Sequence, residues 1–122
     1  MQISDAESVV MQALWRHSPL SAEEVFAAVA GDQGWQEPTV KTLLNRLLTK
    51  GAISAERDGR RYLYAPVLGR DAWLGQESEG LLDRLFGGRV APMVAHFTER
   101  GRLSKKDLAE LRKLLETLDD RK

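Results

Sequence analysis

Residues 37–51 read EPTVKTLLNRLLTKG, and their spacing is that of an amphipathic helix. Apolar residues recur at intervals of three and four, which places them on one helix face: Val40, Leu43, Leu44, Leu47 and Leu48. Pro38 in the opening turn and Gly51 after Lys50 are typical of the two ends of a helix. The opposite face holds no acid after Glu37, whereas an ordinary exposed face mixes both signs of charge. This helix is therefore a candidate contact surface for an anionic partner.

A β-hairpin is predicted directly after this helix, over residues 52–66. Two short alternating runs flank Asp58-Gly59, and an Asp-Gly pair between such runs favours a type I′ turn. Arginines lie on both sides of the predicted turn: Arg57, Arg60 and Arg61. The hairpin is therefore expected to carry a basic tip.

Two more helices are predicted before residue 37. Ser4 with Glu7, and Ser21 with Glu24, have the spacing of a capping box, which marks the start of a helix. The first helix is expected to end near His17, and the second near Ala30, followed by Gly31. Three helices followed by a hairpin indicate a winged helix-turn-helix domain over residues 1–68.

The remainder, residues 69–122, is predicted to form a helical dimerisation domain. Three helices are expected, over 70–86, over 90–99, and after a cap at Ser104. Because such short helices cannot bury their apolar faces by themselves, we expect them to associate with a second copy of the chain. The fold class is thus mainly α with a small β-hairpin wing. The residues expected at the dimer interface are Leu81, Leu85, Phe97, Leu108, Leu111, Leu115 and Leu118.

Charge is segregated along the 122 residues, although 18 Lys and Arg balance 18 Asp and Glu. Residues 1–37 hold six acids and one base, while residues 38–70 hold seven bases and two acids. A basic middle third favours an anionic partner, and a solvated surface is the alternative interpretation of charge alone.

Several classes of protein are not expected. The chain has no cysteine and only two histidines, far apart, so disulfides, thiolate metal sites, a metal centre and a cofactor are not predicted. The sequence contains no Gly-rich phosphate loop and no nucleophile–base pair, so an enzyme is not predicted. No apolar run approaches the roughly 20 residues that a membrane span needs, and no signal peptide is visible. We therefore expect a cytoplasmic protein without membrane insertion.

Double-stranded DNA is the anionic partner that these residue types fit. Thr and Asn side chains reach base edges, Arg binds guanine or phosphate, and Lys neutralises phosphates. The residues predicted to contact DNA are Thr39, Lys41, Thr42, Asn45, Arg46, Arg57, Arg60 and Arg61. An alternative is a winged-helix adaptor that binds proteins, since a fold does not fix a function. Steep salt dependence of binding would favour DNA.

The chain also resembles a known family, the penicillinase and methicillin-resistance repressors (BlaI/MecI), which include the copper-responsive CopY branch. The resemblance spans nearly the whole chain, in ungapped blocks that include 3–7, 14–15, 20–24, 39–47, 50–51, 58–64 and 86–88, with Trp35 between them. It implies a homodimeric winged-helix repressor of dyad-symmetric operators, whose third helix enters the major groove. Residues matching Thr39, Thr42 and Arg46 face DNA in that family.

This chain departs from the family pattern at one position next to the DNA-facing residues. The lysine that the family commonly has before the threonine is Pro38 here, and Glu37 adds a negative charge beside it. The resemblance therefore carries the family's docking mode over to this chain, but not the family's operator sequence or affinity.

Two branches of the family respond to different signals. In the β-lactam branch a sensor-linked protease activity leads to cleavage of an Asn-Phe bond in the dimerisation domain, and the matching pair here is His96-Phe97. The other interpretation places Phe97 in the dimer core and His96 at a helix surface. The copper branch uses a Cys-x-Cys ligand pair, which a chain without cysteine does not have.

Overall fold

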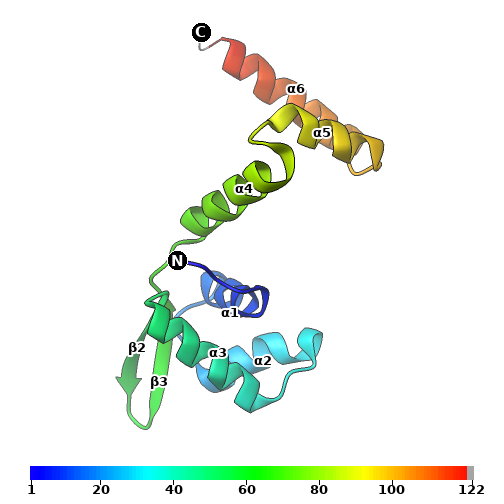
Figure 1. The fold of residues 1–122 in the computed structure, drawn as a ribbon. Coiled ribbons are helices and arrows are strands. Elements are labelled where there is room, and N and C mark those ends of the chain that lie inside the picture. Colours follow the sequence, from blue (N-terminus) through cyan, green and yellow to red (C-terminus); the bar gives the residue numbers. More distant parts are fainter. Residues whose placement is uncertain (121–122) are drawn as a thin grey trace. The chain divides into compact units, whose positions relative to one another are not determined.

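The computed structural model describes residues 1–120, and the chain divides into two compact units, Met1–Gly75 and a second that begins at Gln76. The elements follow in the order α1 (Asp5–Arg16), β1 (Leu20–Ser21), α2 (Ala22–Gln33), α3 (Glu37–Lys50), β2 (Ile53–Asp58), β3 (Arg61–Pro66), α4 (Arg70–Phe86), α5 (Val90–Glu99) and α6 (Lys105–Asp119) (Figure 1). This mainly helical architecture with a small antiparallel sheet confirms the predicted fold class.

The core of the first unit lies among α1, α2 and α3, which gather beside the β2–β3 hairpin (Figure 1). Each helix contributes a row of apolar side chains at helical spacing, as the periodicity predicts. The buried apolar residues are Ile3, Val10, Met11, Ala13, Leu14, Val25, Val29, Val40, Leu43, Leu44, Leu47, Ala52 and Ile53. The predicted amphipathic helix thus spans Glu37–Lys50 and is packed by its apolar face, which leaves its polar face outward.

The sheet contains a short strand that the sequence did not predict. Strands occur in the order β1-β3-β2, and β1 pairs antiparallel with β3 through Leu20 opposite Tyr64 and Ser21 opposite Leu63. Two residues are too few to show alternation, and Ser21 also caps α2 through the predicted capping box with Glu24. The start of α2 and the hairpin are therefore tied together at Ser21.

Two predicted details at chain reversals are wrong. Helix α2 does not end at Gly31 but continues to Gln33, because the left-handed residue that ends it is Gly34, with φ of 67°. In the hairpin Asp58 pairs with Arg61, so the two turn residues are Gly59 and Arg60. Only Gly59 has a positive φ there, 64°, whereas a type I′ turn needs positive φ at both residues. A positive φ at the first position alone fits a type II′ turn.

The first compact unit extends past residue 68 into α4. Trp73 packs against Trp15 of α1, with ring centroids 5.3 Å apart. The indole Nε1 of Trp15 donates a hydrogen bond to the carbonyl oxygen of Leu68, at 2.9 Å. These contacts attach the first turn of α4 to the helical core, whereas the predicted domain limit lies at residue 68.

The second unit contains the rest of α4 together with α5 and α6. Ser104 caps α6 in a capping box with Asp107, and Phe86 lies near His96 of α5, with ring centroids 6.1 Å apart. Within the described part of the chain, α4, α5 and α6 contain no fully buried residue. The same part of the chain includes no helix with the length and hydrophobicity to cross a membrane.

Candidate nucleic-acid interface

The outward face of α3 carries all five residues that the sequence assigns to this helix as DNA contacts: Thr39, Lys41, Thr42, Asn45 and Arg46. All five are exposed. The hydroxyl of Thr42 donates to the carbonyl oxygen of Pro38 at 3.0 Å, and that of Thr49 donates to Asn45 at 3.0 Å. Each bond uses the hydroxyl hydrogen and leaves the oxygen able to accept a further hydrogen bond.

A shallow depression occupies the centre of this face. It is lined by Thr42, Asn45, Arg46, Thr49 and Lys50, and none of these is an acid. No ion pair joins Arg46 to a carboxylate among residues 1–120. The Arg46 guanidinium is therefore available to an external acceptor.

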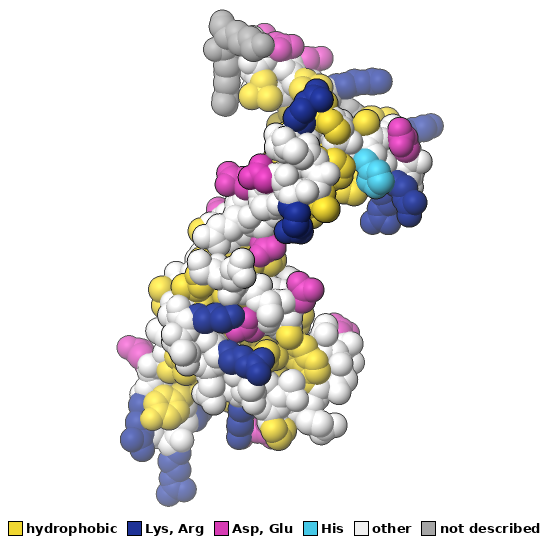
Figure 2. All heavy atoms as spheres, viewed as in Figure 1, with side chains coloured by type: hydrophobic (Ala, Val, Ile, Leu, Met, Phe, Trp, Pro, Cys, Tyr) yellow, Lys and Arg dark blue, Asp and Glu magenta, His cyan; other side chains and the backbone are white. Residues whose placement is uncertain are grey.

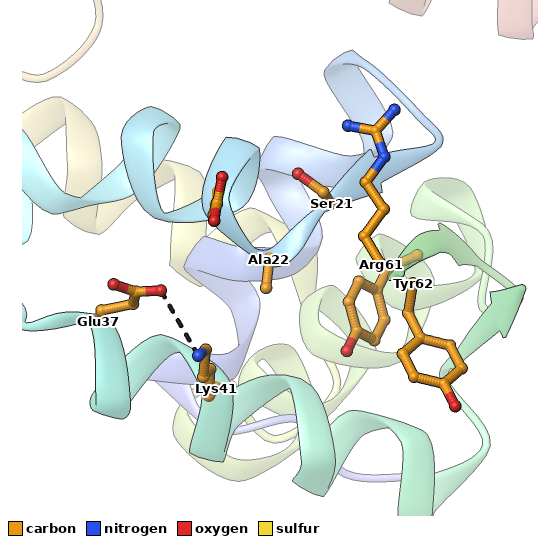
Figure 3. A pocket seen from close by; sticks show the side chains of 8 residues that line it. Ser21, Ala22, Glu37, Lys41, Arg61 and Tyr62 are labelled. Atoms are coloured by element: carbon orange, nitrogen blue, oxygen red, sulfur yellow. Dashed lines mark ion pairs between the residues drawn. The ribbon is translucent and has the colours of Figure 1, made fainter. Parts of the chain in front are cut away.

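A cavity of about 300 Å³ lies on the side of α3 that faces the hairpin (Figure 3). Its walls come from the start of α2, the first turns of α3 and strand β3. They comprise Ser21, Ala22, Glu23, Glu37, Lys41, Arg61, Tyr62 and Tyr64. Glu37 Oε1 lies 3.5 Å from Lys41 Nζ across the first turn of α3. The cavity therefore has charges of both signs on its rim.

The tip of the hairpin carries the three predicted arginines, all exposed. Figure 2 shows Lys and Arg side chains, in dark blue, projecting from the hairpin end of the first unit. Arg57 Nε donates to the carbonyl oxygen of Gly59 at 3.1 Å, and Arg61 lies 3.4 Å from Asp58 Oδ2 and 3.9 Å from Glu24 Oε1. Arg60 occupies the turn itself.

Hydrogen bonds from Ser21 stabilise the ionised form of Glu24. Its carboxylate accepts from the backbone N–H of Ser21 in the capping box, at 2.9 Å. The backbone and side-chain bonds with Ser21 lower the pKa of Glu24 below its usual value, and the charge of Arg61 lowers it further. Glu24 is thus a fixed negative charge beside the wing.

An ion pair between the buried Glu7 and the partly exposed Lys50 anchors the C-terminal end of α3. The Glu7 side chain is only 2% exposed, and its Oε1 accepts from Lys50 Nζ at 2.5 Å and from the Ser4 N–H at 2.8 Å. Lys50 Nζ also donates to the carbonyl oxygen of Gln2 at 2.9 Å. Burial raises the pKa of Glu7, but the hydrogen bonds from Lys50 and Ser4 outweigh burial and leave the pKa below its usual value.

Two residues that line the cavity, Tyr62 and Glu37, are absent from the DNA contacts predicted from the sequence. Tyr62 is 51% exposed and lines the cavity beside Arg61, at a position where strand alternation alone does not separate packing from contact. Glu37 pairs with Lys41, and its i,i+4 spacing was the available signal.

The residues predicted at a dimer interface remain accessible in the single chain. Leu81, Leu85, Phe97, Leu108, Leu115 and Leu118 are exposed, and Leu111 is half-buried. Figure 2 shows hydrophobic side chains on the surface of this second unit. His96 and Phe97 lie inside α5 rather than in a loop, with ring centroids 6.0 Å apart. Any cleavage between them requires local unwinding of α5.

Comparison with known proteins places the chain in a family. The penicillinase repressor family matches residues 3–117. The chain is 35% identical over 121 residues to a penicillinase repressor of Bacillus licheniformis, covering 99% of this chain and 94% of that protein. It is 27% identical over 114 residues to the methicillin resistance regulatory protein MecI of Staphylococcus aureus, covering 93% of each.

A solved structure of a related repressor matches part of the chain. It is the monomeric form of BlaI from Bacillus licheniformis in complex with the blaP half-operator, which matches with a TM-score of 0.53 and 36% identity. The match covers 59% of this chain and 88% of that one. From the family match and the near full-length identity we conclude that the chain belongs to the penicillinase repressor family.

Proposed function

We propose that the chain is a transcriptional repressor that binds double-stranded DNA as a homodimer on a dyad-symmetric operator. The observation that carries this proposal is the exposed, acid-free face of α3 from Thr39 to Thr49, which lies beside a hairpin with three exposed arginines. The winged-helix fold and membership of the penicillinase repressor family support it, and a relative of 36% identity binds a half-operator as a monomer.

The two parts of the interface would have different tasks. Thr42, Asn45 and Arg46 border the depression at the centre of the α3 face, where they can donate to and accept from base edges in the major groove. Arg57, Arg60 and Arg61 extend from the hairpin tip, where they can neutralise phosphates of the flanking backbone. Thr39 and Lys41 lie in the first turns of α3, where they would contact the DNA backbone at the edge of the groove.

Dimerisation would be the task of the second unit. In the described residues α4, α5 and α6 have apolar side chains but bury none of them fully, and Leu108, Leu111, Leu115 and Leu118 form a row along α6. A second copy of this unit is the partner that would cover those side chains. Joining two DNA-binding units raises operator affinity by about 10²- to 10⁴-fold through effective concentration.

The proposal includes a mechanism of induction, in which a sensor-linked protease inactivates the repressor. A cut between His96 and Phe97 would divide α5 and remove α6 from the rest of the unit, which would weaken the dimer and with it operator binding. Phe97 is 39% exposed in the single chain, so its packing role in the intact repressor would depend on a second copy of the unit that covers it. The two roles are compatible if the protease acts on an unwound α5.

Selection of binders from a pool of random duplexes tests the DNA-binding function. We expect purified protein at physiological salt to enrich an inverted repeat, with half-sites separated by one helical turn or a multiple. An Arg46→Glu variant is the control, because this exposed substitution reverses a charge at the centre of the α3 face without touching the core. A folded, dimeric wild-type protein that enriches no sequence would instead indicate a protein-binding adaptor.

A further inference from the structure

We infer that Glu37 determines specificity, because it pairs with Lys41 and thereby withholds that cation from DNA that is not the operator. The inference rests on the proposed function and adds to it a residue that lowers affinity for non-operator sequences. It concerns the rim of the cavity between α3 and the hairpin, not the depression around Arg46.

The pair is built into the first turns of α3. Glu37 is the first residue of the helix and Lys41 lies four residues later, so the two side chains lie on the same helix side. Glu37 Oε1 and Lys41 Nζ are 3.5 Å apart, and the side chains are 45% and 60% exposed (Figure 3). Both groups are accessible to solvent, so a phosphate can compete with Glu37 for Lys41.

The second cation on this rim, Arg61, has acidic neighbours as well. Its guanidinium lies 3.4 Å from Asp58 and 3.9 Å from Glu24. By contrast, Arg46 has no acidic partner within residues 1–120. Both cations on the cavity rim, Lys41 and Arg61, therefore have acidic partners, whereas Arg46 on the α3 face has none among the described residues.

This arrangement affects the two modes of DNA binding differently. Binding to an arbitrary sequence depends on phosphate neutralisation, and a lysine that remains paired with a carboxylate contributes little to it. On an operator, base contacts from Thr42, Asn45 and Arg46 dock α3 closely, and Lys41 then exchanges Glu37 for a DNA oxygen at high effective concentration. The pair is therefore broken on the operator and kept elsewhere.

Salt titrations of DNA binding by a Glu37→Gln variant test this inference. On a scrambled duplex we expect the slope of log K against log salt to steepen by about 0.9, which corresponds to one further neutralised phosphate. Affinity for that duplex then rises roughly five- to tenfold at 0.1 M salt. On the selected operator the slope stays as in the wild type, so the ratio of operator to scrambled affinity falls.

Two further variants distinguish loss of the Glu37–Lys41 ion pair from the general loss of one negative charge near the DNA. Glu23→Gln removes the same charge from the same cavity, but Glu23 forms no ion pair with Lys41 or Arg61 in the described chain, so we expect it to leave the slope unchanged. In a Lys41→Gln background, Glu37→Gln should lose its effect on the slope.

The possible failures of the two proposals are distinguishable. Equal changes with Glu23→Gln and Glu37→Gln, or an equal gain on operator and scrambled duplexes, would overturn the role of Glu37 while leaving operator binding intact. A wild-type protein without preference for any duplex would overturn the repressor function itself, and the role of Glu37 with it.

Discussion

At the scale of single residues, the Glu7–Lys50 pair joins the last residue of α3 to the first turn of α1. Glu7 belongs to the first turn of α1 and Lys50 is the last residue of α3, so their contact links two elements that are distant in sequence. Lys50 is consequently held against the start of the chain rather than directed at a partner. The pair thus fixes the position of Lys50 at the edge of the α3 face, where it lines the depression with Arg46.

Replacing Glu7 by Gln should destabilise the first unit by about 1–3 kcal/mol at pH 7, because a buried charged hydrogen bond is lost. The pKa of Glu7 is lowered in the folded chain, so its stabilising effect is complete above the unfolded pKa and is lost as pH falls through the folded pKa. The difference between wild type and variant should therefore shrink below about pH 4.5. Chemical denaturation at several pH values measures it.

Glu24→Gln is the matched control for this substitution. Both positions are the third helical residue of a capping box, in which Gln is an acceptable replacement, but only Glu7 is buried and has a lysine partner. Equal destabilisation by the two substitutions would show that the Lys50 contact contributes nothing measurable.

Arg46 should contribute to sequence discrimination rather than to general affinity. It lies at the centre of the exposed α3 face and has no acidic partner in the part of the chain that the structure describes. We expect Arg46→Ala to weaken operator binding by about 1–3 kcal/mol and to change scrambled-duplex binding much less. A drop of equal size on both duplexes would reduce its role to a phosphate contact.

At the scale of elements, how far the sequence predicts the structure depends on the length of the pattern. The bounds of α3 agree with prediction because Pro38 and Gly51 mark its ends and five apolar residues mark its face. Strand β1 was missed because two residues contain no period, and the end of α2 was misplaced because Gly31 and Gly34 both offer a stop.

In the candidate site too, features set by a local sequence pattern could be predicted, and contacts between distant elements could not. Exposure of the α3 face and of the three arginines follows from periodicity and from the hairpin that Asp58-Gly59 indicates, so it could be predicted. The contact of Arg61 with Glu24 joins β3 to α2 and depends on the pairing of β1 with β3, which no local pattern reveals. Which cations are compensated was therefore visible only in the folded chain.

The hairpin should act on DNA through its charge alone. Arg60→Gln removes an exposed charge from the turn, so the slope of log K against log salt should become shallower by about 0.9 on operator and scrambled duplexes alike. Arg61→Gln should have a smaller effect, because Asp58 and Glu24 already compensate that charge. A change in sequence preference with Arg60→Gln would contradict a purely backbone role.

At the scale of the whole molecule, the two units differ in how much of their apolar surface they bury. The first encloses a continuous core drawn from three helices and the sheet. Among the described residues of the second unit, leucines on α4 and α6 remain accessible. The difference is what the proposal of a self-sufficient first unit and an associating second unit requires.

Leu115→Asp should therefore yield a monomer with a folded first unit, because a charge in the α6 leucine row cannot be buried against a partner. Operator affinity should fall by about 10²- to 10⁴-fold as the advantage of linked half-sites is lost. Ala109→Asp is the control, since this exposed residue of α6 lies outside the leucine row. Sedimentation that shows an intact Leu115→Asp dimer would overturn the assignment of this surface.

The contact between Trp15 and Trp73 gives the protein an internal optical reporter. All three tryptophans, Trp15, Trp35 and Trp73, lie within Met1–Gly75, and the first and last have ring centroids 5.3 Å apart. Indole emission therefore comes from the first unit alone, and the second is silent at that wavelength. Subunit separation that leaves the first unit folded would leave the spectrum in place, whereas detachment of the α4 turn from α1 would expose both indoles and shift it to the red.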